Sequence, residues 1–145
     1  MAYQGIFKPR NPHKYKGDVN NIIYRSSWEL RLMSYLDKHD EVIQWGSEEV
    51  VIPYVSPHDN RKHRYFVDFV VKKRGPNGNT EVILIEVKPK AQTRPPEIPK
   101  RKTKRFIDEV YAWGVNQAKW AAAEEYCKNR GWTFQIFTEN ELGIK

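Results

Sequence analysis

Charged residues interrupt stretches of the chain that otherwise look built to be buried. Residues 82–90 read VILIEVKPK, so Glu86 and Lys88 follow four aliphatic residues. Side chains alternate between the two faces of a strand, which places these two charges on the same face as Val82 and Leu84. Burying even a paired charge is costly unless further partners complete its hydrogen bonds. The pattern therefore predicts a chemical reason for charge in this strand.

A second acidic residue, Asp68, interrupts the apolar stretch that precedes this strand. If Asp68 and Glu86 lie on neighbouring strands and face the same way, their carboxylates meet near one end of a hairpin. Two like charges about 4 Å apart repel by about 4 kcal/mol at an effective dielectric constant of about 20. A divalent cation would remove that penalty, and Mg²⁺ is held by one or two carboxylates together with water or phosphate oxygens. Alternatively, a nearby arginine, Arg25 or Arg64, could neutralise Asp68.

Two strands are needed to bring these carboxylates together. Residues 64–73 (RYFVDFVVKK) and 80–88 (TEVILIEVK) both predict strands, and the turn sequence RGPNGN between them predicts a hairpin. Alternation in the first strand would place Phe66, Asp68 and Val70 on one face, and Tyr65, Val67, Phe69 and Val71 on the other.

The elements before this hairpin begin with a helix. Residues 25–40 carry apolar side chains at helical spacing, namely Trp28, Leu32, Tyr35 and Leu36. Ser26 and Glu29 have the spacing of a capping box at the start of this helix. Residues 41–46 and 48–55 then predict short strands, followed by a loop.

The elements after the hairpin predict a helix and a closing strand. Residues 104–131 are helical in pattern, with a break expected near Gly114 and an end at Gly131. Residues 132–137 (WTFQIF) predict a final strand. Together, residues 1–145 predict a single domain of the α/β class with a mixed central sheet flanked by helices.

The overall composition favours a polyanionic partner. The chain has 25 Lys and Arg against 18 Asp and Glu, a formal net charge of +7. It lacks an apolar run of roughly 18 residues and its first residues do not resemble a secretory signal, so we expect no membrane span. We accordingly expect a soluble, intracellular protein. Its charge suits nucleic acid or an acidic membrane surface and does not by itself distinguish the two. The single cysteine, Cys127, excludes an internal disulfide bond.

The positive charge is concentrated in two segments. Residues 1–25 predict an extended basic arm on the surface, and residues 89–103 predict a basic, proline-rich loop. Eight Lys or Arg residues oppose one acid between residues 88 and 105. The loop could be a solvated linker, but its position after the candidate ligands favours contact with DNA phosphates. The candidate DNA-binding residues are Lys14, Lys16, Lys90, Arg94, Lys100, Arg101, Lys102, Lys104 and Arg105.

The order of these motifs resembles a known group of enzymes. Asp68, followed by Glu86-Val87-Lys88 at the end of an apolar strand, resembles the core of the PD-(D/E)xK nucleases, and this resemblance implies a restriction-endonuclease-like fold. Val67 stands where the motif has proline, a position that supplies no ligand. The stretches YRSSWE, VIPY, RYFVDF, IEVKPK and GWTFQIFTENEL resemble the endonuclease subunits of heteromeric transposases. The resemblance to the head-completion nucleases of T-even-type phages is closer and also includes YKGD, WGSE, KRF and NQAKW.

This resemblance implies Mg²⁺-dependent hydrolysis of phosphodiester bonds in double-stranded DNA, with Mn²⁺ able to substitute. Asp68, Glu86, the Val87 carbonyl and Glu29 would ligate the metal, and Lys88 would orient or deprotonate the attacking water. A phage head-completion nuclease would act on packaged or concatemeric DNA ends in the host cytoplasm, in contact with portal or neck proteins or within the virion.

Two other functions fit the same residues. The chain could be a structural head-completion protein that holds DNA or docks on the portal with vestigial cleavage, or it could be the endonuclease subunit of a transposon or repair system. For Glu29, a purely capping role is an alternative to catalysis. For Glu86 and Lys88, the alternative is a partly exposed ion pair at the edge of a strand, which contributes about 0 to 1 kcal/mol.

Overall fold

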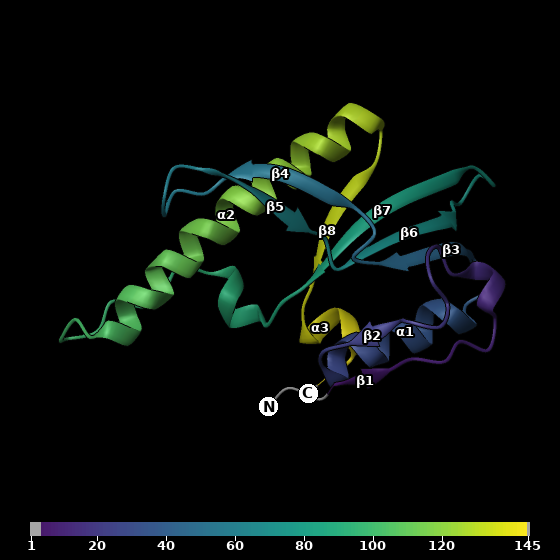
Figure 1. The fold of residues 1–145 in the computed structure, drawn as a ribbon, viewed down its shortest axis with the longest axis horizontal. Coiled ribbons are helices and arrows are strands. Elements are labelled where there is room, and N and C mark those ends of the chain that lie inside the picture. Colours follow the sequence, from purple (N-terminus) through teal and green to yellow (C-terminus); the bar gives the residue numbers. More distant parts are fainter. Residues whose placement is uncertain (1–3, 145) are drawn as a thin grey trace.

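A four-stranded mixed sheet lies at the centre of the computed structural model, which describes residues 4–144 (Figure 1). Its strands lie in the order β3 (Val42–Ser47), β6 (Phe69–Arg74), β7 (Thr80–Val87) and β8 (Thr133–Phe137). The β3–β6 and β6–β7 pairs are antiparallel, whereas β8 runs parallel to β7. The predicted hairpin and the predicted mixed sheet are therefore confirmed.

One face of the sheet is covered by helix α1 (Ser27–Lys38), whose Leu32, Met33 and Leu36 are buried. They pack in one hydrophobic cluster with side chains of the sheet, including Ile83 and Ile85 of β7. Met33 takes the place that the sequence pattern assigned to Tyr35, which is 54% exposed. The short helix α3 (Glu139–Leu142), which the sequence analysis did not predict, adds Leu142 to the same cluster.

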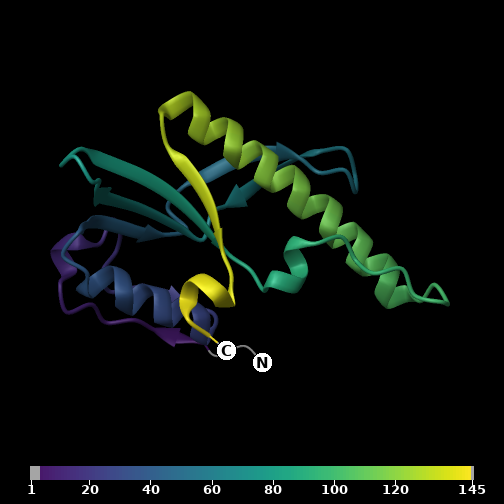
Figure 2. The ribbon, with the colours of Figure 1, turned by 180° about the vertical axis from the view of Figure 1, so that it is seen from behind.

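The opposite face is covered by helix α2 (Lys104–Arg130) and by a ribbon of two strands, β4 (Val51–Val55) and β5 (Lys62–Phe66). Only the C-terminal half of α2 contributes buried side chains, which are Trp120, Ala123 and Cys127. They share a second cluster with Leu84 of β7. The N-terminal half of α2 extends beyond the sheet, as Figure 2 shows from behind. The alternation of β7 therefore places the even-numbered residues of the strand, Glu86 included, on the α2 face.

The strand predicted for residues 64–73 is wrong in one respect, because it is two strands. β5 ends at Phe66 and pairs with β4, whereas β6 begins at Phe69 and pairs with β3 and β7. Between them, Val67 is buried and its N–H donates to the Val50 carbonyl at 3.0 Å. The chain thus passes from the ribbon to the central sheet immediately before Asp68.

The break predicted near Gly114 is also wrong, because α2 continues through it. A glycine inside a helix costs about 1 kcal/mol relative to alanine, which the packing of a long helix can offset. The predicted end of the helix is confirmed, since Gly131 caps it with a left-handed φ of 71°. Although α2 has 27 residues, no helix within residues 4–144 combines the length and the apolar character needed to cross a bilayer.

The N-terminal segment is not the extended surface arm that its charge predicted. Of residues 1–25, residues 1–3 lie outside the described range, and the rest includes β1 (Gly5–Ile6), the 3₁₀ turn η1 (Pro12–Lys14) and β2 (Ile23–Tyr24). Apolar side chains from this segment enter the α1 cluster, namely Phe7, Tyr15 and Ile22. Hydrophobic anchors thus fold the segment onto the sheet despite its positive charge.

Lys14 is buried, with 7% of its surface exposed, so its assignment to DNA binding is wrong. Its Nζ donates to the backbone carbonyls of Asp37 at 3.0 Å and His39 at 2.8 Å, at the C-terminal end of α1. The last carbonyls of a helix lack partners within the helix and carry partial negative charge, so an ammonium group satisfies them. Lys14 therefore joins the N-terminal segment to α1.

Candidate active site

Asp68 and Glu86 come together at one end of the β6–β7 pair. Phe69 pairs with Ile85, and the same antiparallel register places Asp68 opposite Glu86. The backbone N–H of Val87 donates to Asp68 Oδ2 at 2.8 Å, which fixes the direction of this side chain. The structure thus brings the two predicted carboxylates together, and it does so through backbone pairing.

Glu86 is buried at 5% exposure and is contacted on both carboxylate oxygens. The hydroxyl of Tyr65 donates to Oε1 at 2.7 Å, and Lys88 Nζ lies 3.7 Å from Oε2. Glu86 and Lys88 thus form the ion pair of the alternative, but its acidic member is buried. Lys88 itself remains partly exposed. Asp68, Glu86 and Lys88, at this end of the β6–β7 pair, are called the acidic corner below.

Burial and mutual repulsion set the electrostatics of this corner. Burial, followed by the neighbouring Glu86 carboxylate, raises the pKa of Asp68 to about 8, although the Val87 N–H bond and the Lys88 charge oppose the shift. Burial also raises the pKa of Tyr65 far above its ordinary value, so the phenol remains a hydrogen-bond donor. The pair of carboxylates therefore lacks sufficient positive charge around it.

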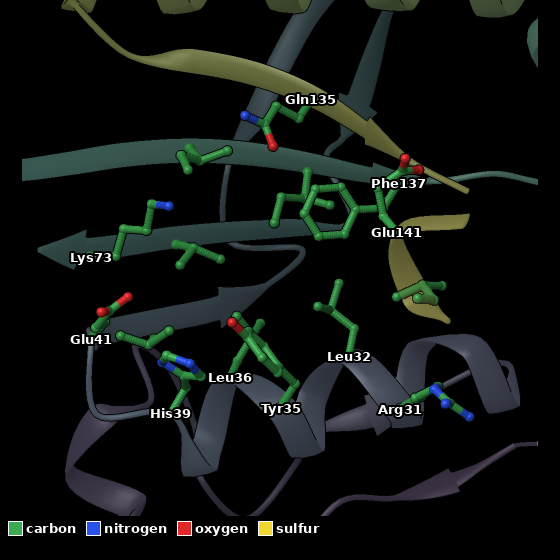
Figure 3. A pocket seen from close by; sticks show the side chains of 15 residues that line it. Arg31, Leu32, Tyr35, Leu36, His39, Glu41, Lys73, Gln135, Phe137 and Glu141 are labelled. Carbon is green, nitrogen blue, oxygen red and sulfur yellow. The ribbon is translucent and has the colours of Figure 1, made fainter. Parts of the chain in front are cut away.

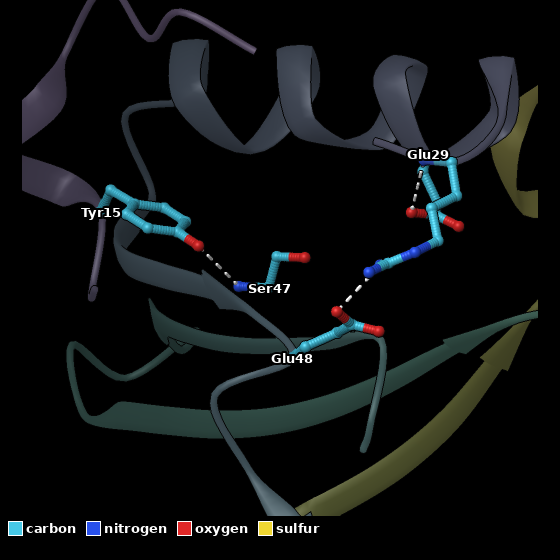
Figure 4. A network of polar contacts seen from close by, with 5 residues as sticks. Tyr15, Glu29, Ser47 and Glu48 are labelled. Atoms are coloured by element: carbon cyan, nitrogen blue, oxygen red, sulfur yellow. Dashed lines mark hydrogen bonds and ion pairs between the residues drawn. The ribbon is translucent and has the colours of Figure 1, made fainter. Parts of the chain in front are cut away.

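Glu29, the third predicted acid, belongs to a network of polar contacts at the start of α1, which Figure 4 shows. Its N–H donates to the Ser26 hydroxyl at 3.1 Å, but its carboxylate accepts from the Arg25 N–H at 3.2 Å, so the predicted capping box is only half formed. Burial raises the pKa of Glu29, and the charges of Glu48 and Glu86 add to the shift. Glu29 therefore takes part in the start of α1 and also lies within electrostatic reach of Glu86.

Glu48 adds a fourth acid that the sequence analysis did not identify. It follows β3 with a left-handed φ of 56°, unusual for a residue other than glycine, and its N–H donates to the Asp68 carbonyl at 3.1 Å. Its carboxylate pairs with Arg25 Nη1 at 2.8 Å. Arg25 is thus engaged with Glu48, and Arg64 lies over the exposed ring of Phe66, so the alternative in which either arginine neutralises Asp68 is not supported.

The donor set of this corner suits a hard divalent cation. Among the described residues, no three His, Cys, Asp or Glu side chains already surround a common point. Mg²⁺, however, takes one or two carboxylates from a protein and completes its shell with water or phosphate oxygens. Asp68 and Glu86 are such a pair, and the raised pKa of Asp68 is the result expected when two buried carboxylates share too little positive charge.

The remaining basic candidates are exposed. Lys16 lies in the N-terminal segment between η1 and β2, and Lys90 lies in the 3₁₀ turn η2 (Lys90–Thr93), which follows the active-site strand. The others lie in the loop or in the first turn of α2. The exposed members are Lys16, Lys90, Arg94, Lys100, Arg101, Lys102, Lys104 and Arg105. Figure 2 shows this loop and the start of α2 projecting away from the sheet. Their contact with DNA remains a prediction.

A separate hollow lies on the α1 side of the sheet (Figure 3). This cavity of about 630 Å³ has an apolar lining that includes Leu32, Ile83 and Phe137, with charged groups such as Arg31 and Lys73 around it. None of the predicted catalytic residues lines it. The residues predicted to be catalytic therefore lie outside this cavity.

Tyr65 and Glu48 are the residues of this corner that sequence analysis missed. Strand alternation placed Tyr65 on the face opposite Asp68, and only the break after Phe66 reverses that expectation. Glu48 falls within a motif, WGSE, that the resemblance included, but its left-handed backbone has no marker in the sequence.

Comparison with known proteins gives two matches that agree with this geometry. Residues 39–139, which include Asp68, Glu86 and Lys88, match the family described as TnsA-like endonuclease N terminal. The chain is also 44% identical over 146 residues to the head completion nuclease of Enterobacteria phage T4, covering 98% of this chain and 95% of that protein. The chain therefore belongs to the family of TnsA-like endonuclease N-terminal domains, which has a restriction-endonuclease-like fold.

Proposed function

We propose that this chain is a metal-dependent DNA endonuclease that acts in the completion of phage heads. The observation that carries the proposal is the convergence of Asp68, Glu86 and Lys88 at the end of β7. Membership of an endonuclease family and the name of the phage T4 relative support it. Its substrate would be double-stranded DNA, packaged or concatemeric.

Each side chain would have a separate role in hydrolysis. Asp68 and Glu86 would hold Mg²⁺ or Mn²⁺, with Glu29 and the Val87 carbonyl as further ligands. The bound cation would supply Lewis-acid stabilisation of the phosphate and lower the pKa of a water molecule. Lys88 would orient or deprotonate that water and stabilise the negative charge that develops. As the water oxygen bonds to phosphorus, the phosphorus–oxygen ester bond breaks, and the leaving oxygen takes up a proton.

The exposed basic loop would hold the DNA backbone next to these groups. Lysine and arginine side chains bind phosphates largely without regard to base sequence, which suits an enzyme that acts on phage DNA in general. We place the activity in the host cytoplasm during assembly, with portal or neck proteins as partners and the virion as a further location.

A nuclease assay tests this function. Supercoiled and linear DNA are incubated with the protein in Mg²⁺, Mn²⁺ or EDTA, alongside Glu86→Gln and the matched variant Glu81→Gln, which changes an exposed acid at the other end of the same strand. We expect cleavage with either metal, none in EDTA, and loss of cleavage only in Glu86→Gln. Equal cleavage by both variants would contradict the proposal. A Glu86→Gln variant that cannot cleave but still completes phage heads would indicate a structural role instead.

A further inference from the structure

The two oxygens of Glu86 have different surroundings. Oε1 accepts a hydrogen bond from the Tyr65 hydroxyl at 2.7 Å, whereas Oε2 lies 3.7 Å from Lys88 Nζ. One oxygen is therefore held by the protein interior, and the other is turned toward the partly exposed lysine. A carboxylate held at one oxygen cannot rotate freely about its last bond, so this contact determines which oxygen faces the site.

Tyr65 is itself fixed in place. It is 3% exposed, belongs to the hydrophobic cluster under α2, and pairs through its backbone with Ile52 of β4. Lys119 Nζ, from α2, lies 5.5 Å from the centre of its ring. The phenol oxygen is rigidly attached to the ring, so a packed ring fixes the position of the hydroxyl.

The course of the chain places Tyr65 and Asp68 against the same carboxylate. In a continuous strand, residues three positions apart point to opposite faces. Here the strand is interrupted between Phe66 and Phe69, and Tyr65 bonds to Glu86 while Asp68 lies opposite it. The interruption that the sequence pattern did not predict is therefore the feature that lets both side chains reach Glu86.

We propose that Tyr65 is a positioning residue for the active site, an inference that rests on the proposed function. Its hydroxyl holds Glu86 so that Oε2 faces Lys88 and is available to the cation, and it does not contact the DNA or the reacting atoms. Partners that orient a ligand from behind typically change metal affinity by 10- to 100-fold when they are removed. Tyr65 accordingly acts through Glu86 alone.

Tyr65→Phe tests this role, with Tyr54→Phe as the matched control. Tyr54 lies on β4 with Lys119 Nζ 5.9 Å from the centre of its ring. The hydrogen bond that Glu86 Oε1 accepts, however, comes from Tyr65 and not from Tyr54. The dissociation constant for Mn²⁺ is measured by electron paramagnetic resonance without DNA. The Mg²⁺ concentration for half-maximal cleavage is measured separately. We expect Tyr65→Phe to raise both quantities by about tenfold and to change the rate at saturating Mg²⁺ less. Tyr54→Phe should leave both within about twofold of the parent.

A second pair of variants separates positioning from a general structural effect. In a Glu86→Ala background the hydroxyl has no carboxylate to hold, so adding Tyr65→Phe should leave the residual Mn²⁺ affinity unchanged. Tyr65→Phe alone would bury a carboxylate oxygen of Glu86 without a partner, and it could fail to fold for that reason. The double variant has no such carboxylate, so it still gives a result in that case.

The outcomes distinguish the two proposals. If the parent cleaves DNA and binds Mn²⁺ but Tyr65→Phe behaves like the parent, the positioning role is wrong and the proposed function stands. An equal loss of affinity in the parent and the Glu86→Ala background would also overturn the positioning role. If the parent neither binds Mn²⁺ nor cleaves DNA, both proposals fail together.

Discussion

The acidic corner and the basic loop carry opposite charge, and they differ in how far their side chains are exposed to solvent. Glu86 is buried and Asp68 is half-buried, and both are held by specific donors, the Tyr65 hydroxyl and the Val87 N–H. By contrast, the lysines and arginines between residues 90 and 105 are exposed on a projecting segment. Groups fixed by specific donors act individually, whereas exposed charges act by their sum. Single substitutions should therefore have large effects in the corner and small effects in the loop.

Lys88→Met should give the largest change, because it removes the only lysine that contacts Glu86 within residues 4–144. We expect the rate of DNA cleavage to fall by about 100- to 1,000-fold, the usual result of removing one group that stabilises developing charge. Single-turnover cleavage in Mg²⁺ measures this rate. The control is Lys72→Met, an exposed lysine on β6, which should cleave at nearly the parent rate. A slow Lys72→Met variant would mean that net charge, and not the position of Lys88, controls the rate.

Lys14→Met should lower the free energy of unfolding by about 2 to 4 kcal/mol, since it removes two bonds from a charged donor to the end of α1. Lys16→Met, two residues away and exposed, should change it by less than about 0.5 kcal/mol. Denaturant unfolding of both variants provides the measurement. Similar stabilities would show that Lys14 is not held in the interior, and its assignment to DNA binding would then return.

The raised pKa of Asp68 predicts how stability depends on pH in EDTA. Its folded pKa of about 8 exceeds the value of about 3.9 in an unfolded chain, so the folded protein binds this proton more tightly between those values. The free energy of unfolding should therefore fall as the pH rises from about 5 to 8. Asp68→Asn, which cannot ionise, should show a shallower decline in the same titration. Parallel curves would assign the decline to other groups.

Neutralising the loop should give the smallest effect per residue. Each phosphate contact contributes about 0.9 to the slope of log affinity against log salt on duplex DNA. Changing Lys100, Arg101 and Lys102 together to Gln should reduce that slope by about 2 to 3, and any single change by about 1 or less. Fluorescence anisotropy of a labelled duplex at several salt concentrations measures the slope. An unchanged slope in the triple variant would exclude these residues from phosphate contact.

Much of the architecture could be predicted from local pattern. The turn RGPNGN and the alternation of residues 80–88 predict the β6–β7 hairpin, and the hairpin register brings Asp68 opposite Glu86. Features decided by distant contacts could not be predicted. One such feature is the end of β5 at Phe66, where its pairing with β4 stops. Another is Lys14, whose charge suggested a surface position but whose ammonium group is held inside by carbonyls at the end of α1. Helix α2 continues through Gly114, because one glycine inside a helix costs only about 1 kcal/mol relative to alanine.

Direct binding of Mn²⁺ to the parent and to Asp68→Asn tests the central claim, that Asp68 and Glu86 form a site for a divalent cation. Electron paramagnetic resonance without DNA reports the affinity independently of cleavage. We predict that the parent binds Mn²⁺ and that Asp68→Asn binds it at least about tenfold more weakly, because one of the two carboxylate ligands is lost. Equal Mn²⁺ affinity in the two proteins would contradict the account.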